Sequence, residues 1–217
     1  MTALLIALVL VAVDPGGTAT ASDVQLDLWL VDQPGIHLQA ERVTGGEGRQ
    51  AQLSRPRVSL GDALGLVADD GLVDLDDGTV RADGAVQATL ATGEPVEIRS
   101  ERFDLDAKAG TGTFTGTVVV THGDLVVTCE RLEVAFDTEQ QAIRSVVALG
   151  GVEIRQADRL GRGERAEFDV EPGTVVLTGS PYLEQGSVRL SGTTIRFDVA
   201  GGEVACTGCR AVFGEGR

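Results

Sequence analysis

Few side chains of this 217-residue chain are suited to covalent chemistry. The two histidines, His37 and His122, are accompanied by no nucleophile elbow and no glycine-rich phosphate loop. Carboxylates are abundant, but most fall on the polar face of predicted strands, where solvation explains them. We therefore expect no enzyme activity, no catalytic residue and no cofactor.

The three cysteines are the other reactive groups. Cys129 is in phase with Leu125 and Val127, which predicts a small buried thiol. Cys206 and Cys209 flank a Thr-Gly turn and are candidates for a short disulfide, which fits an oxidising compartment. Free thiols, or a redox or metal pair, remain alternatives, although a zinc site there lacks visible partners.

An acidic segment, residues 69–78, carries spaced carboxylates of the kind that bind calcium. It lacks the glutamate that closes an EF-hand loop, and a hairpin turn explains Asp77-Gly78 more simply. We predict no metal site.

The stretch from Thr113 to Phe136 predicts the elements that position these groups. Its apolar residues recur with period two, which is typical of strands with one buried face; they are Val118, Val120, Leu125, Val127, Leu132, Val134 and Phe136. His122-Gly123-Asp124 provides a tight reversal, since glycine readily adopts positive φ. The pattern predicts two strands and the beginning of a third.

Similar phrases recur along the whole chain. Their anchoring residues are spaced 29, 31, 29, 34 and 29 apart, and they are Glu41, Asp70, Glu101, Glu130, Glu164 and Thr193. A repeat of about 30 residues is typical of stacked supersecondary units. We predict an all-β, elongated antiparallel stack, with residues 138–149 a strand rather than a helix. Residues 23–57 are expected to form an irregular opening repeat.

Charge and composition limit the classes of binding partner that the chain suits. Lys and Arg number 18 against 33 Asp and Glu, a net charge of −15, which argues against nucleic acid and anionic membrane surfaces. Aromatic residues make up only 4% of the chain, so the inward strip consists mainly of Val, Leu and Ile. Such a strip suits alkyl chains, although a sealed core is the alternative.

The N-terminus predicts export. Leu4 to Val13 is an apolar run of about ten residues, too short to span a bilayer, and Ala19-Thr20-Ala21 has the form that signal peptidase cuts. We predict a signal peptide at residues 1–21, with an uncleaved membrane tether as the alternative because no Lys or Arg precedes the run.

Two long phrases carry a family resemblance: GTFTGTVVVTHGDLVVTCERLEVAFD, from Gly112, and ALGGVEIRQADRLGRGERAEFDVEPGTVVLTGSPYLEQGSVRLSGTTIRFDVAGGEV, from Ala148. They resemble the OstA-like, or LptA-like, family of periplasmic lipopolysaccharide transport proteins. The resemblance covers residues 112–213 well and the first hundred only loosely, where it is also similar to LptC-like domains. The cysteines and the acidic balance depart from the family pattern.

The resemblance implies a β-jelly roll opened like a folded sheet, which carries lipid A acyl chains inside and joins end to end with LptC-like and LptD-like jelly rolls, or with further copies, between the inner and outer membranes. It implies a periplasmic location, a divergent OstA/LptC-like part at residues 22–110 and a continuous OstA-like part at 111–214. The lipid-binding residues would be the inward apolar set, namely Val118, Val120, Leu125, Val127, Leu132, Val134, Phe136, Val152, Ile154, Phe168, Val175, Leu177, Leu183, Val188, Leu190, Ile195 and Phe197. The alternative is a structural β-repeat assembly protein with a sealed core and no lipid ligand.

Overall fold

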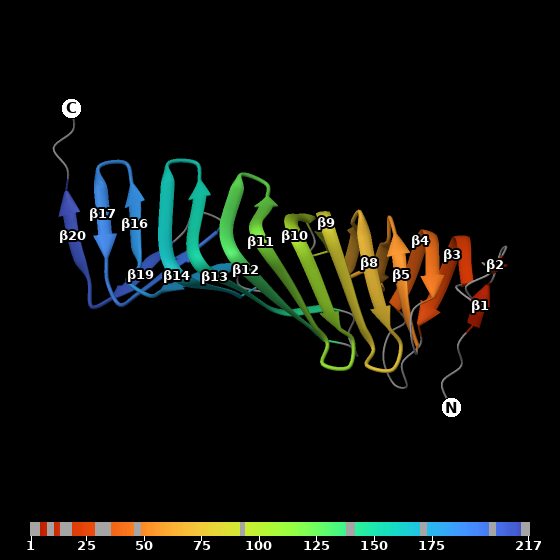
Figure 1. Cartoon of the computed structure of the whole chain (residues 1–217). Coiled ribbons are helices and arrows are strands. Elements are labelled where there is room, and N and C mark those ends of the chain that lie inside the picture. The colour runs from red at the N-terminus through yellow and green to blue at the C-terminus, as the bar shows by residue number, and fades with distance from the viewer. Residues whose placement is uncertain are drawn as a thin grey trace.

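A computed structural model shows the strands of this chain stacked side by side along one long axis, with the N-terminal and C-terminal strands at opposite ends (Figure 1). The structure describes residues 5–7, 11–13, 19–28, 36–45, 49–91, 94–137, 142–169, 173–199 and 203–213. Every regular element in these ranges is a β-strand, and every pairing is antiparallel. The all-β fold predicted from the alternation is confirmed.

Twenty strands lie in the described ranges. The first ten are β1 (Leu5–Ala7), β2 (Val11–Val13), β3 (Ala19–Leu28), β4 (Ile36–Gly45), β5 (Gln50–Ser54), β6 (Arg57–Leu60), β7 (Leu64–Val67), β8 (Asp70–Asp74), β9 (Thr79–Leu90) and β10 (Val96–Asp106). The others are β11 (Thr111–His122), β12 (Leu125–Asp137), β13 (Ala142–Gln156), β14 (Arg159–Asp169), β15 (Thr174–Thr178), β16 (Tyr182–Gln185), β17 (Val188–Ser191), β18 (Thr194–Asp198), β19 (Val204–Thr207) and β20 (Arg210–Phe213).

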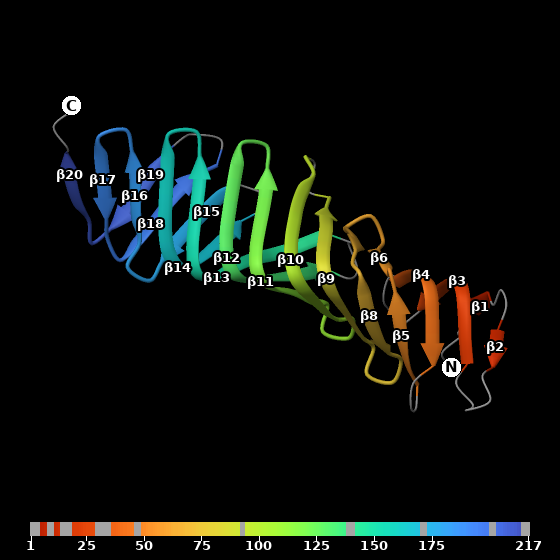
Figure 2. The same cartoon turned by 45° about the horizontal axis from the view of Figure 1, so that its top comes forward.

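The strands form two layers that share the same chain segments (Figure 2). β11, for example, pairs with β12 through Val118–His122 in what we call the first layer and through Thr111–Thr115 in the second layer. Elsewhere two short strands take the place of one long strand. The long strand β14, for example, pairs with β16 in the first layer and with β15 in the second layer. The sheet is therefore folded lengthwise, with a corner edge where strands cross between layers and a hairpin edge where they turn back.

Each corner combines a residue with positive φ and a side chain that packs on it from the preceding corner along the chain. Gly116 in β11 has a φ of 87°, and a Cβ there would lie 2.6 Å from the Cβ of Glu101 in β10. Gly179 has a φ of 75°, and its Cβ would lie 2.5 Å from the Cβ of Glu164. A larger residue would suffer both the left-handed backbone and the clash, so these positions require glycine.

The other corners repeat this pairing, which explains the repeat seen in the sequence. The pairs are Asp69 with Gly84, Glu130 with Gly150 and Thr193 with Gly208, and Glu41 forms an ion pair of 2.9 Å with Arg55, whose φ is 49°. The repeat anchors are thus corner residues. One anchor shifts, because Asp69, between β7 and β8, packs on Gly84 of β9 in place of the predicted anchor Asp70.

One predicted boundary is wrong. The alternation predicted a third strand beginning near Leu132, whereas β12 runs unbroken from Leu125 to Asp137. Its pairing shifts register between Thr128 and Arg131, where the strand passes a corner. The corner changes the phase of the alternation without ending the strand, which made one strand look like two.

Other expectations have mixed outcomes. Residues 142–149 belong to β13, so the strand predicted there is confirmed for the described part, whereas residues 138–141 lie outside it. The described part of residues 23–57 is not irregular, because β4 pairs in both layers like the later strands and buries Ile36 and Leu38. Most of the predicted signal peptide lies outside the described residues, which include only β1, β2 and the start of β3 there.

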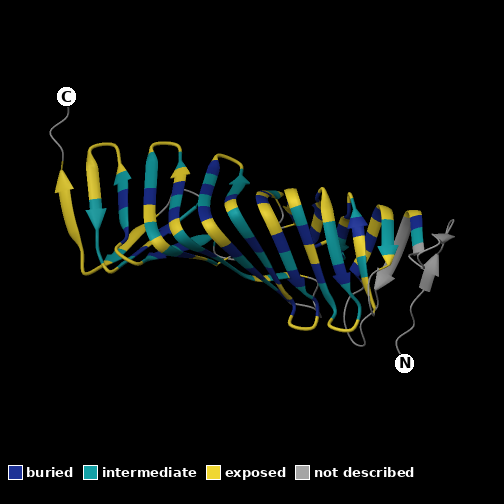
Figure 3. Cartoon of the chain, in the orientation of Figure 1, coloured by how far each residue is buried: buried dark blue, intermediate teal, exposed yellow. Residues whose placement is uncertain are grey.

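The core lies between the two layers along most of the length. Bands of buried and exposed residues alternate along most of the central strands (Figure 3). At the centre the rings of Phe103 and Phe114 pack with centroids 4.5 Å apart, and both side chains are fully buried. Burying a side chain of this size contributes roughly 1.5–3 kcal/mol, so the inward strip is a main source of stability.

The corner packing predicts unequal costs for two glycines that flank β16. Gly179→Ala introduces both a left-handed alanine and a clash with Glu164, and we expect it to lower the free energy of unfolding by about 2–4 kcal/mol. Gly186→Ala is the matched control, since Gly186 has a φ of 57° but no atom within 4 Å of the position that a Cβ would take. We expect a loss of about 1–2 kcal/mol there. Equal losses in urea denaturation would contradict a stabilising role for the corner contact.

The buried thiol also gives a prediction. Cys129 is 7% exposed, and burial raises the pKa of its thiol to about 11. At pH 8 the group is therefore protonated as well as shielded. We expect Ellman's reagent to detect no thiol in the native protein and one per chain after unfolding without reductant. A reactive thiol in the native protein would contradict this placement.

Candidate functional site

An apolar cavity of about 150 Å³ lies between the two layers near the middle of the chain. Its walls come from strands of both layers and from the turns beside them, and they are formed by Leu90, Val96, Ile98, Val120, His122, Leu125, Val127, Leu132, Val146, Phe168, Asp169, Gly173, Thr174 and Val199. We call this cavity the central pocket. It has the volume of cavities that take one benzene-sized guest, roughly 150 Å³.

The polar residues of the central pocket lie towards the hairpin edge. His122 ends β11, with its Nε2 3.6 Å from Glu94 Oε2, and Asp169 ends β14 in the opposite layer. The deeper walls, such as Ile98 and Val127, are apolar. An apolar interior with polar groups at one side favours a molecule with an alkyl part and a polar head.

The structure brings together only some of the predicted lipid-binding residues. Val120, Leu125, Val127, Leu132 and Phe168 line the central pocket. The rest of the inward set is packed into the core: Val118, Val134, Phe136, Val152, Ile154, Val175, Leu177, Leu183, Ile195 and Phe197 are buried, and Leu190 is partly buried against them. In this conformation most of the predicted lining is therefore filled by its own side chains.

Val188 is 38% exposed, although it lies on the same face of β17 as Leu190, which packs against the core. It begins β17, which lies beside the terminal strand β20, where every side chain is exposed. The alternation indicates which face a residue takes, but it does not indicate where the opposite layer ends.

Sequence reasoning missed part of the pocket. Leu90, Val96 and Ile98 come from the first half of the chain, where β9 and β10 form its wall. They alternate like the predicted lining residues, and Ile98 lies three residues before the repeat anchor Glu101. Carrying the alternation one repeat further towards the N-terminus would have found them.

A polar side chain ties the two layers together beside the pocket. Gln156, at the end of β13, donates from Nε2 to the Val199 carbonyl oxygen at 2.7 Å and to Asp124 Oδ1 at 3.0 Å. Val199 belongs to the second layer, whereas Gln156 pairs in the first. Gln156 Oε1 is buried without a hydrogen-bond partner, which costs about 1–3 kcal/mol. The tie closes the hairpin edge at the expense of an unsatisfied acceptor.

The acidic turn favours a structural explanation over calcium. Asp74 Oδ1 accepts hydrogen bonds from the backbone N–H groups of Asp76 and Asp77 at 2.9 and 3.0 Å, and its Oδ2 accepts one from Gln50. The hydrogen bond from the Asp77 N–H lowers the pKa of Asp74 most, and the hydrogen bond from Gln50 lowers it further. Among the described residues, no group of three or more His, Cys, Asp or Glu side chains is arranged to hold a metal ion.

Around β13, β14 and β16 the outer face of the first layer carries ion pairs and cation–π contacts. Glu153 accepts hydrogen bonds from Arg155 and Arg162, and these bonds, led by that from Arg155, lower the pKa of its carboxyl group. The guanidinium groups of Arg162 and Arg189 lie 5.8 and 5.3 Å from the ring centroid of Tyr182. The exterior is therefore polar where the interior is apolar.

The part of the chain that the structure describes contains no helix of the length and apolar character needed to cross a membrane. The arrangement there is a folded sheet with an apolar interior.

Residues 97–203 match the family model described as LptA/(LptD N-terminal domain) LPS transport protein. The chain carries an LptA-like domain. Its matched range runs from β10 to the last residue before β19, and it contains most of the strands that form the central pocket.

Curated relatives are similar over about half of the chain. The chain is 24% identical over 113 residues to the lipopolysaccharide export system protein LptA of Haemophilus influenzae, which spans 49% of this chain and 66% of that protein. It is 26% identical over 119 residues to LptA of Escherichia coli K12, which spans 52% of this chain and 64% of that protein. The chain therefore spans slightly less than two thirds of the length of these relatives.

A solved structure shares the fold. LptH of Pseudomonas aeruginosa, described as the LptA-homologous periplasmic component of the lipopolysaccharide transport device, superposes with a TM-score of 0.50 at 19% identity. The superposition covers 56% of this chain and 96% of LptH. The similarity confirms the β-jelly roll for the part that it covers.

The tie at Gln156 predicts how the central pocket is reached. Gln156→Ala removes two hydrogen bonds and the unsatisfied acceptor together, so we expect the free energy of unfolding to change by less than about 1 kcal/mol. Binding of an apolar fluorescent dye should become faster by about tenfold, the equivalent of about 1.4 kcal/mol, because the hairpin edge opens more readily. Stopped-flow fluorescence measures this rate, with Gln185→Ala at the exposed end of β16 as control. An unchanged rate would show that the tie does not limit entry.

Proposed function

We propose that this protein is a periplasmic lipopolysaccharide transport component that shields acyl chains between its two layers. The observation that carries the proposal is the central pocket, an apolar cavity with walls from both layers and polar residues at the hairpin edge. The family match over residues 97–203 and the names of the relatives support lipopolysaccharide as the guest.

The energetics suit a carrier. Each methylene withdrawn from water contributes about 0.8 kcal/mol, so even a short buried part of an acyl chain is held without any specific polar contact. The polar head of the lipid would stay at the hairpin edge, near His122 and Asp169. No covalent step is needed, so the residues proposed to act are the apolar ones.

The folded sheet provides a way to enlarge the pocket. The layers are joined by continuous strands at the corner edge, whereas at the hairpin edge they meet through contacts such as the Gln156 tie. Separating the hairpin edges would expose more of the predicted lipid-binding residues, beginning with Ile154 and Leu183. We therefore retain the inward set as proposed lipid contacts of a wider state.

Assembly would extend the shielded path. Edge strands at both ends of the sheet can pair with strands of other jelly rolls, which gives a bridge between the inner and outer membranes with LptC-like and LptD-like domains or further copies as partners. An energy source upstream would give the transport its direction.

A structural β-repeat protein without a lipid ligand is the second candidate. It is favoured by the close packing of most of the predicted lining, in which Val118, Val175 and Ile195 have no exposed surface. The two functions differ in whether the interior ever admits a guest.

Photo-cross-linking distinguishes the two. A photoreactive phenylalanine analogue at position 120 points into the central pocket, whereas the same analogue at position 119 points to the opposite face of β11. In cells that make lipopolysaccharide, we expect an adduct from position 120 and at least tenfold less from position 119. Adding Val146→Phe, which fills the pocket, should remove the adduct while the melting temperature stays within a few degrees. Equal adducts from both positions, or none from position 120, would favour the sealed core.

A further inference from the structure

The C-terminal end of the sheet consists of two short strands, one in each layer. β19 pairs with β18 through Val204–Thr207, and β20 pairs with β17 through Arg210–Phe213. Among the described residues neither strand has a second partner, so their outer backbone groups can receive a further strand.

Exposed apolar side chains gather at this end. The large apolar residues that are exposed in the described part of the chain are Val67, Val188, Val204, Val212 and Phe213. All but Val67 belong to β17, β19 and β20, and Phe213 is 74% exposed. Figure 3 shows β20 exposed along its whole length. An apolar cluster beside an open strand edge is typical of an interaction surface.

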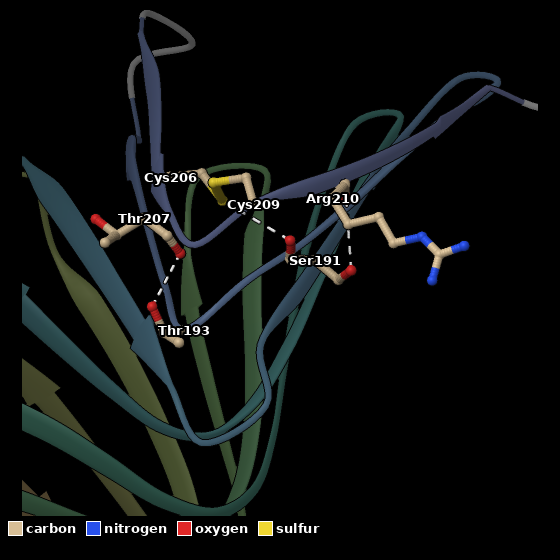
Figure 4. The surroundings of a disulfide bond; sticks show 6 residues. All are labelled: Ser191, Thr193, Cys206, Thr207, Cys209 and Arg210. Atoms are coloured by element: carbon tan, nitrogen blue, oxygen red, sulfur yellow. Dashed lines mark hydrogen bonds between the residues drawn. A yellow bond between two sulfur atoms is a disulfide. The ribbon is translucent and has the colours of Figure 1, made fainter.

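A disulfide crosses the corner between these two strands (Figure 4). Cys206 lies in β19, Cys209 directly precedes β20, and their Cα atoms are 5.8 Å apart. Because β19 belongs to the second layer and β20 to the first, the bond joins the outermost strands of both layers.

The disulfide is seated against the preceding corner. A Cβ at Gly192 would lie 2.8 Å from Cys206 Sγ, so only glycine leaves room for the sulfur. Thr193 donates from its backbone N–H and from Oγ1 to the Thr207 carbonyl oxygen, both at 2.9 Å. Ser191 Oγ lies 3.5 Å from the Arg210 carbonyl oxygen, on the other side of the bond. The disulfide therefore holds both strands against a packed corner.

Little else fixes β20. All four of its residues are exposed, so burial of apolar side chains contributes little to its position. It is held by its backbone pairing with β17 and by the covalent link through Cys209. A short exposed edge strand of this kind opens locally more easily than the central strands.

We propose that the Cys206–Cys209 disulfide braces β19 and β20 into one preformed docking edge, and that the N-terminal edge of a second copy of this chain adds a strand to each layer there. The inference rests on the end-to-end assembly proposed above, and it attributes much of the affinity between two copies to the Cys206–Cys209 disulfide. Holding both strands in place before contact reduces the ordering cost of binding.

A second copy suits this edge because its N-terminal strands also divide between the layers. Once the predicted signal peptide is removed, the first layer ends at Val24–Leu28 of β3, which pair with Ile36–Ala40. The second layer then ends at β4, whose Val43 and Thr44 lose their partners Ala21 and Thr20. Each of the two C-terminal strands, β19 and β20, can therefore pair with one N-terminal strand of the second copy in the same layer. Such a head-to-tail contact can add copies in a line.

The test compares the mature chain, which begins after residue 21, with its Cys206→Ser/Cys209→Ser variant. We expect the oxidised wild-type protein to self-associate in analytical ultracentrifugation, and the double variant to associate at least tenfold more weakly. Hydrogen exchange of Arg210–Phe213 should be faster in the double variant, whereas exchange in β11 and β12 should not change. Cys129→Ala, which keeps the disulfide, is the control and should associate like the wild type.

Reduction gives a reversible form of the test. Dithiothreitol converts the disulfide to two thiols and is itself oxidised to a cyclic disulfide. Treated wild-type protein should behave like the double variant and recover on reoxidation. Val212→Lys, with the disulfide intact, should also weaken association if β20 is the docking strand.

The possible failures are distinct. If the double variant associates as tightly as the wild type, the brace is refuted, whereas end-to-end assembly stands. If Val212→Lys associates like the wild type, the docking edge does not include β20 and the inference fails. If the oxidised wild type stays monomeric at all concentrations, both the second copy as occupant and homotypic assembly are refuted.

Discussion

The contact between a corner glycine and the side chain packed on it sets the geometry of this molecule. At Gly116 and Gly179 the backbone takes a left-handed conformation, and the neighbouring strand places Glu101 or Glu164 where a Cβ would otherwise lie. Such a corner lets the chain pass from one layer to the other, within the single strand β11 at Gly116 and between β15 and β16 at Gly179. Successive corner contacts are separated by two passes of the chain across the sheet, which together take about 30 residues. One local constraint, repeated at this interval, therefore generates the folded sheet.

That constraint also makes the two long edges of the sheet unequal. Strands run through the corner edge, and no local rearrangement separates the layers there. At the hairpin edge the layers meet through side-chain contacts, of which the Gln156 tie leaves a buried acceptor unsatisfied. The central pocket has its polar residues on this weaker side. A guest that enters from the hairpin edge therefore works against packing and a few hydrogen bonds, whereas the backbone pairing remains intact.

The sequence was sufficient to predict whether most residues point inward or outward. It was not sufficient to predict whether the interior is a packed core or an open groove. Alternation along β11 and β12 identified Val118 and Val127 as inward, and the corner residues supplied the period. It could not separate a packed core from an open groove, since both place the same aliphatic residues inside. Val118 is buried in the core, whereas Val120, two residues on, lines the pocket. The difference depends on the distance between layers, which no single strand encodes. The register shift in β12 was missed for a related reason, because a corner resembles a strand end.

Apolar side chains lie in the interior and at the C-terminal edge, whereas the sides of the molecule carry charged groups. This distribution connects the proposed shielding of a lipid with the proposed end-to-end assembly. Inside, aliphatic side chains either fill the core or line the central pocket, whereas the outer face of the first layer carries ion pairs such as Glu153 with Arg162. A net charge of −15 further discourages contact with anionic surfaces along the sides. Among the residues that the structure describes, large exposed apolar side chains gather mainly at the C-terminal edge, next to the interior that they would extend. Contacts between copies are thereby directed to the ends, where joining two sheets makes their interiors continuous.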